Sequence, residues 1–78
     1  MPRIKPMSWK DLERVILAFG YVLVRQTASH RIYWKEGVTR PLVVNDHGKK
    51  DIEPFVILGL LRTAGISREE FLAMVEKI

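Results

Sequence analysis

The sequence predicts a small α+β domain in which a three-stranded antiparallel sheet carries helices on one face. The chain has 78 residues, which allow one domain with a single small core, because a chain of this length buries only about 60% of its unfolded surface. A segment of helical periodicity is followed by three short strand-like runs and then by two further helical segments. Because short turns join the three runs, we expect an antiparallel meander.

The first helix is predicted to begin after Ser8. Ser8 is a favourable N-cap residue, and Asp11 three positions later completes a start that is similar to a capping box. Gly20 stands where a helix commonly ends in a left-handed residue. Between them, apolar residues recur at helical spacing and predict one buried stripe: Leu12, Val15, Ile16 and Phe19. Residues 1–7 contain two prolines and are expected to form an irregular arm of the single domain, residues 1–78.

Three runs rich in β-branched and aromatic residues predict the strands, at residues 21–26, 30–35 and 40–45. Residues 27–29 and Glu36-Gly37 form the connecting turns. Pro41 lacks a backbone N–H, so the third strand is expected to begin at or near the edge of the sheet.

Alternation along the second strand predicts which of its side chains share a face. One set contains His30, Ile32 and Trp34, and the other contains Arg31, Tyr33 and Lys35. We expect the set with Tyr33 to lie on the uncovered face of the sheet. Tyr33, Trp34 and Tyr21 are candidates for stacking on nucleic-acid bases, with a purely structural role as the alternative. His30 is then either a partly buried, hydrogen-bonded side chain or a group placed for chemistry.

Two further helices follow a polar loop at residues 46–51. Pro54 suits the first turn of the second helix, which is expected to run to about Ala64 and to end at Gly65. Residues 67–70, with the sequence Ser-Arg-Glu-Glu, form a capping box for a short last helix. The resulting order, α-β-β-β-α with a short C-terminal helix, is the layout of the double-stranded RNA-binding domain.

The second helix is predicted to present a partner surface. Residues 55–61 are apolar around the whole circumference of this helix, and only one face can pack on the sheet. The side chains predicted to remain for a partner are Phe55, Val56 and Leu58. A partner protein, the N-terminal arm or a second copy of the chain, which would give a homo-oligomer, could cover them.

Basic residues are concentrated in the middle of the chain. The net charge is +4, and residues 25–50 carry six basic and two acidic side chains, whereas residues 51–78 carry three and five. This distribution favours an acidic partner such as RNA, with plain solubility as the alternative. The chain has no cysteine, no apolar segment typical of a signal peptide and no apolar run long enough to cross a bilayer. We therefore expect a cytoplasmic protein without membrane contact.

The two histidines of the chain are the candidate proton carriers, because histidine ordinarily titrates near neutral pH. His30 enters a strand directly after a small polar turn in a basic hairpin, an arrangement suited to a phosphodiester substrate. His47 is a candidate second proton carrier, with a solvated loop residue as the alternative. No paired histidine or acid spacing supports a metal site, and no cofactor is expected.

Several motifs together resemble the HicA (YcfA-like) toxin family. The resemblance extends from about Ser8 to Leu72, and the Ser-His pair combined with an Ala-Gly-Ile-Ser segment near the C-terminus is its most specific part. The motifs are Phe19-Gly20-Tyr21, Val24-Arg25-Gln26, Ser29-His30-Arg31-Ile32-Tyr33, His47-Gly48-Lys49 with Ile52 and Pro54, and the segment from Leu60 to Phe71.

The resemblance implies a ribonuclease toxin that degrades messenger RNA without a metal ion and is silenced by a HicB-type antitoxin covering the active site. It places the family's essential histidine at His30. As a general base, His30 would remove the proton of a ribose 2′-OH; protonation of the leaving oxygen is the alternative. The candidates for binding the RNA phosphates are Arg25, Ser29, Arg31, Lys35, Lys49 and Lys50. For the two loop lysines among them, a solvated role is equally compatible with the sequence.

A non-catalytic module that binds RNA or a protein is the second hypothesis for the same fold. The family usually has glycine where this chain has Ala28, and its second helix normally begins with polar residues where this chain has Phe55 and Val56. The intact Ser29-His30 pair favours the enzyme.

Overall fold

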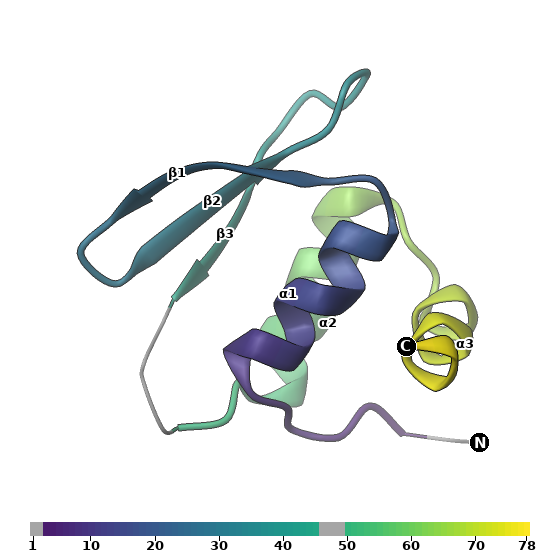
Figure 1. The fold of residues 1–78 in the computed structure, drawn as a ribbon. Helices are drawn as coiled ribbons and strands as arrows, with labels where there is room; N and C mark the ends of the chain where they lie inside the picture. Colours follow the sequence, from purple (N-terminus) through teal and green to yellow (C-terminus); the bar gives the residue numbers. More distant parts are fainter. Residues whose placement is uncertain (1–2, 46–49) are drawn as a thin grey trace.

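In the computed structural model, which describes residues 3–45 and 50–78, the chain forms a three-stranded sheet and three helices (Figure 1). The elements are α1 (Trp9–Ala18), β1 (Val22–Thr27), β2 (His30–Trp34), β3 (Leu42–Asn45), α2 (Pro54–Ala64) and α3 (Arg68–Lys77). The predicted α+β order is therefore confirmed. Within the described ranges, no helix combines the length and the apolar character needed to cross a membrane.

The strands form the predicted antiparallel meander in the order β1-β2-β3. A two-residue turn joins β1 to β2, and the β2–β3 register sets His30 opposite Asn45. β3 begins at Leu42, two residues later than predicted, because Pro41 has no N–H to donate to the ladder.

Side-chain N-caps and a glycine mark the helix boundaries that the sequence indicates. The Oγ of Ser8 accepts a hydrogen bond from the backbone N–H of Asp11 at 3.1 Å and so caps α1. Ser67 and Glu70 form both hydrogen bonds of a capping box at the start of α3. At the end of α2, Gly65 has a φ of 72°, a left-handed conformation that glycine adopts without strain.

Helices α1 and α2 lie on one face of the sheet, and α3 packs against them on the side away from it (Figure 1). The core contains apolar side chains from each layer, among them Leu12, Val15, Ile16, Tyr21, Tyr33, Leu42, Val44, Ile57, Leu61 and Phe71. The irregular N-terminal arm extends this core, because Ile4 is buried and Met7 exchanges backbone hydrogen bonds of 3.3 and 2.8 Å with Ile52. The arm thereby holds the segment that leads into α2.

The helices cover the face of the sheet that was predicted to be open. Tyr33 is fully buried and Arg31 is 9% exposed, whereas His30 and Trp34 are exposed. Alternation gave the two sets of side chains correctly, but it did not determine which set meets the helices. The covered face also buries Leu42 and Val44 of β3, and Glu13 of α1 accepts hydrogen bonds there from both Arg31 and Tyr33.

Ala28, the first residue of the β1–β2 turn, has a φ of 48°. Two-residue hairpin turns favour glycine where φ is positive, because the Cβ atom of an L-residue approaches the backbone too closely in this conformation. The strain costs about 1–2 kcal/mol. In the turn that precedes His30, an alanine therefore adopts a backbone conformation that glycine favours.

We expect Ala28→Gly to raise the free energy of unfolding by about 0.5–1 kcal/mol, because the strain relieved exceeds the extra entropy of glycine in the unfolded chain. Urea unfolding measures the change. Ala73→Gly, at an exposed position inside α3, is the matched control and should lower the stability by about 1 kcal/mol. A loss of stability in Ala28→Gly would contradict the strained turn.

Candidate functional site

The uncovered side of the sheet, named the open face from here on, carries the candidate site. Cross-strand partners point to the same side of an antiparallel sheet, so the register identifies the members of this face. They are Val22, Arg25 and Thr27 of β1, His30, Ile32 and Trp34 of β2, and Val43 and Asn45 of β3. These described residues include no aspartate or glutamate, so the open face is neutral or positive over its whole described extent.

His30 lies at the turn end of the open face, and its side chain is exposed. Thr27 stands opposite it on β1, and Asn45 stands opposite it on β3. Directly opposite residues have Cβ atoms about 4.5–5.5 Å apart, so a hydroxyl and an amide flank the imidazole. His30 is therefore accessible to a substrate, and the alternative of a partly buried histidine is wrong.

A β-bulge in β1 brings Arg25 onto the open face. The register shifts between Leu23 and Arg25, which makes Val24 the extra residue. Strict alternation from Leu23 would place Arg25 on the covered face, and the bulge reverses this. Arg25 consequently lies opposite Ile32 and diagonal to His30, at a Cα separation of roughly 7–8 Å.

The other described candidates for phosphate binding are spread over the molecule. Ser29 is half-buried in the turn directly before His30. Lys35 follows the opposite end of β2, where its ammonium lies 5.9 Å from the centre of the Tyr21 ring. Lys50 is exposed near the end of β3. The fold thus brings Ser29 to the histidine and leaves Lys35 at the far end of the strand.

Two predicted site residues, His47 and Lys49, lie outside the described residues. Their roles as second proton carrier and phosphate ligand stay predictions. Within the described ranges, no three His, Cys, Asp or Glu side chains gather closely enough to form a metal site.

Arg31 is held by a cluster on the covered face and does not reach the open one. Its Nε donates a hydrogen bond to Oε2 of Glu13 at 2.9 Å, and its Nη2 forms an ion pair with the same oxygen at 2.7 Å. The Tyr33 hydroxyl donates a short hydrogen bond to that oxygen as well. The guanidinium lies 4.5 Å from the centre of the Trp9 ring, which adds a cation–π contact. The predicted binding of phosphate by Arg31 does not fit this position, because its charge is already neutralised and buried.

The same cluster perturbs Tyr33. Burial and the hydrogen bond to Glu13 together raise the pKa of Tyr33 to about 12, although the neighbouring Arg31 lowers it. The neutral phenol is therefore the form that the fold stabilises. This cluster connects α1 to β2 and fixes the strand that carries His30.

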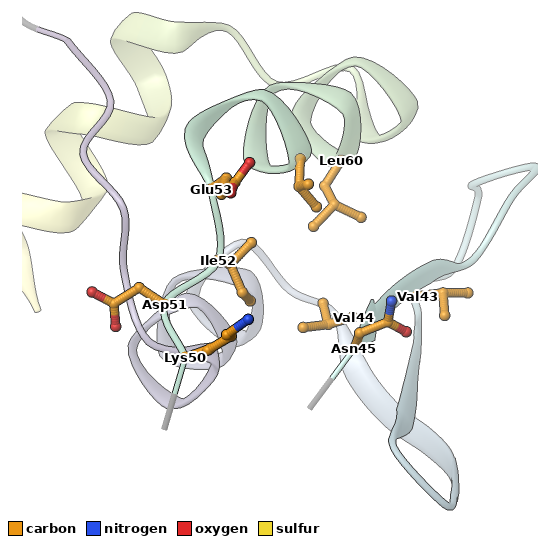
Figure 2. A pocket seen from close by; sticks show the side chains of 9 residues that line it. Val43, Val44, Asn45, Lys50, Asp51, Ile52, Glu53 and Leu60 are labelled. Carbon is orange, nitrogen blue, oxygen red and sulfur yellow. The ribbon is translucent and has the colours of Figure 1, made fainter. Parts of the chain in front are cut away.

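A hollow of about 240 Å³ lies between β3 and the start of α2 (Figure 2). Its lining is mainly apolar and includes the polar side chains of one β3 residue and of the segment that leads into α2: Val43, Val44, Asn45, Lys50, Asp51, Ile52, Glu53, Val56 and Leu60. His30 does not line the hollow, but its neighbour Asn45 does. Asn45 therefore belongs both to the open face and to the lining of this hollow, which also includes Lys50.

The predicted partner surface on α2 is only partly available. Phe55 is 69% exposed and Val56 is 42% exposed. Leu58 packs against the core and lines a different depression, near Arg3 and Ile4 of the N-terminal arm. The exposed apolar surface therefore consists of Phe55 and Val56, at the start of the helix.

The sequence did not predict Asn45, Thr27 or Glu13 as residues of the site. The position of Thr27 opposite His30 follows from the two-residue β1–β2 turn, whereas that of Asn45 follows from the β2–β3 register. Glu13 belongs to the helix and becomes recognisable only when α1 packs on Arg31. No local sequence signal marks it.

The fold and the open face define a small α+β domain with the layout of a double-stranded RNA-binding domain and an exposed histidine on its sheet. The family model of the HicA toxin of bacterial toxin–antitoxin systems matches residues 9–66. The chain therefore belongs to the HicA toxin family, as its motifs indicated.

A solved structure supports the fold. A chain of a toxin–antitoxin complex from Streptococcus pneumoniae superimposes with a TM-score of 0.66 at 24% sequence identity, over 78% of this chain and 100% of that chain. At this identity the likeness concerns the fold alone. The comparison with curated proteins gave no match.

We expect the stability of the protein to fall as the pH rises from about 10 to about 12. The folded state holds the Tyr33 proton more tightly than the unfolded state, whose tyrosine pKa is about 10, so the stabilisation is complete below that pH and is lost above it. Urea unfolding at a series of pH values measures the slope. Tyr33→Phe should show a shallower decline, and equal slopes for the two proteins would contradict the coupling.

Proposed function

We propose that this protein is a toxin that cleaves messenger RNA, with His30 as its general acid–base residue and a HicB-type antitoxin as its inhibitor. Membership of the HicA toxin family supports a toxin. The observation that carries the catalytic assignment is the exposed His30 on a face whose described residues include Arg25 and no carboxylate.

The chemistry uses the RNA's own nucleophile. Neutral His30 accepts the proton of a ribose 2′-OH, and the 2′-oxygen attacks the adjacent phosphorus. The bond from phosphorus to the 5′-oxygen breaks, and that oxygen takes up a proton from solvent water. The products are a 2′,3′-cyclic phosphate and a 5′-OH end.

The neighbours of His30 have complementary roles in this proposal. Arg25 is close enough to stabilise the negative charge that develops on the phosphorane oxygens. Thr27 and Asn45 can hydrogen-bond to the ribose or to a phosphate oxygen on either side of the histidine. The step needs no metal in this form, since the base and the cation are both side chains.

Expression of wild type should stop growth and degrade bulk messenger RNA, whereas His30→Ala should do neither. A general base typically contributes about 10²–10⁴-fold, so the purified variant should cleave RNA more slowly by that factor. End-group analysis should show 2′,3′-cyclic phosphates. Undiminished cleavage by His30→Ala would exclude the assignment.

Cleavage by the purified wild type should persist at full rate in excess chelator. Arg25→Gln is the companion variant, and it should slow cleavage while leaving chelator resistance unchanged. Loss of activity in chelator that added divalent metal restores would contradict the metal-independent mechanism.

The exposed start of α2 is the proposed docking surface for the antitoxin. Val56 lines the same hollow as Val43 of the open face, so a protein seated on α2 would lie directly beside the sheet that carries His30. Such a position would allow it to block substrate. A second copy of the chain on this surface is the competing arrangement.

Phe55→Glu should remain toxic but escape neutralisation when co-expressed with a HicB-type antitoxin that neutralises the wild type. Burial of a charge in an apolar interface is the reason. Leu17→Glu, at a 42% exposed position on α1, is the control and should stay neutralised. If Phe55→Glu is neutralised as well as wild type, the docking surface lies elsewhere; size-exclusion chromatography of wild type and Phe55→Glu then tests the homo-oligomer.

A non-catalytic binding module is the competing function, and two observations favour it. Ala28 strains the turn before His30, and the start of α2 is apolar where a phosphate-binding helix end would be polar. Wild type that is harmless on induction and leaves RNA intact would establish this alternative.

A further inference from the structure

The open face has an exposed aromatic side chain for which the proposed reaction has no use. Trp34 lies on the same face as His30 and is 38% exposed. Among the three aromatic side chains that the sequence offered for base stacking, Tyr21 and Tyr33 are 3% and 0% exposed. The fold therefore leaves Trp34 as the member of that set that a base can reach.

The surroundings of Trp34 leave its ring free for a ligand. The ring of Trp9 carries the Arg31 guanidinium at 4.5 Å, whereas no described cation lies over the ring of Trp34. Its cross-strand partner is Val22, a side chain that is 55% exposed and too small to cover an indole.

The spacing along the strand suits a short nucleic-acid segment. Trp34 is four residues from His30, which corresponds to roughly 13 Å of extended strand. Arg25 lies opposite Ile32, midway between them, so the order along the face is indole, guanidinium and imidazole. An RRM sheet of similar construction stacks about two or three bases.

The charge and chemistry of the open face favour RNA over a protein as its occupant. Its described residues offer a guanidinium for a phosphate, an indole for a base and no carboxylate to repel the backbone. A base must be unstacked before it can lie on an indole, and the bases of an A-form duplex are not accessible in this way. The occupant that fits is therefore single-stranded.

We propose that the open face binds single-stranded RNA, with a base stacked on Trp34 and the backbone passing Arg25 towards His30. The inference rests on the proposed ribonuclease function and adds to it the form of the substrate. Trp34 is a specificity-determining residue that selects unpaired RNA. The face of the sheet, and not the helices, holds the substrate next to the histidine.

Binding of a short single-stranded RNA with 2′-O-methyl groups tests this proposal without requiring cleavage, since the modification removes the attacking hydroxyl. Fluorescence anisotropy of the labelled oligonucleotide gives Kd for wild type and variants. Wild type should bind the single strand at least about tenfold more tightly than the duplex of the same sequence. Trp34→Ala should raise Kd by about 10- to 100-fold, the range expected for loss of a base–aromatic stack.

Two further variants separate stacking from charge and from folding. Trp34→Phe should recover most of the affinity, because phenylalanine still offers an aromatic face. Arg25→Gln should weaken binding and reduce the dependence of log Kd on log salt by about one phosphate contact. Leu17 is an exposed apolar residue on α1 outside the open face, so Leu17→Ala should bind the RNA with the same Kd as wild type.

The outcomes distinguish this inference from the proposed function. Equal affinity for duplex and single strand, or unchanged Kd in Trp34→Ala, would overturn the inference even if His30→Ala abolishes cleavage. Tight, Trp34-dependent binding by a protein that does not cleave RNA would support it and reject the enzyme. Loss of antitoxin binding in Trp34→Ala, with RNA binding unchanged, would assign the face to a protein partner instead.

Discussion

The arrangement of this molecule depends on one carboxylate oxygen of Glu13. It accepts hydrogen bonds from Arg31 and from the Tyr33 hydroxyl across the contact between α1 and β2. Loss of this acceptor would leave the buried guanidinium uncompensated and would be strongly destabilising, so the ion pair holds this side of β2 against α1. His30 belongs to the other set of alternating residues, and the ion pair thereby exposes it to solvent.

Two local irregularities shape the surroundings of His30. The bulge at Val24 moves Arg25 to the open face, and the turn holds Ala28 at a positive φ directly before Ser29 and the histidine. Each departs from the regular backbone that the flanking residues favour. Such departures persist where the rest of the fold determines the position, and they are commonly found at functional sites.

The proposed RNA surface and the proposed antitoxin surface adjoin without coinciding. The open face belongs to the sheet, and the exposed apolar side chains Phe55 and Val56 belong to α2. Val43 and Val56 meet at the hollow beside β3, the edge strand next to His30. In the proposed arrangement, RNA and the antitoxin therefore occupy neighbouring surfaces.

The sequence by itself determined the elements, their order and the helix ends, because helical periodicity, N-caps such as Ser8 and Ser67, and Gly65 act over a few residues. It also determined that His30 shares a face with Trp34. Only the tertiary structure decided which face is covered, since alternation is symmetric and the carboxylate that breaks the symmetry comes from another element. The positions of two arginines also depend on contacts between elements. Arg31 pairs with Glu13 on the covered face, and Arg25 lies on the open face because of a bulge that depends on strand pairing.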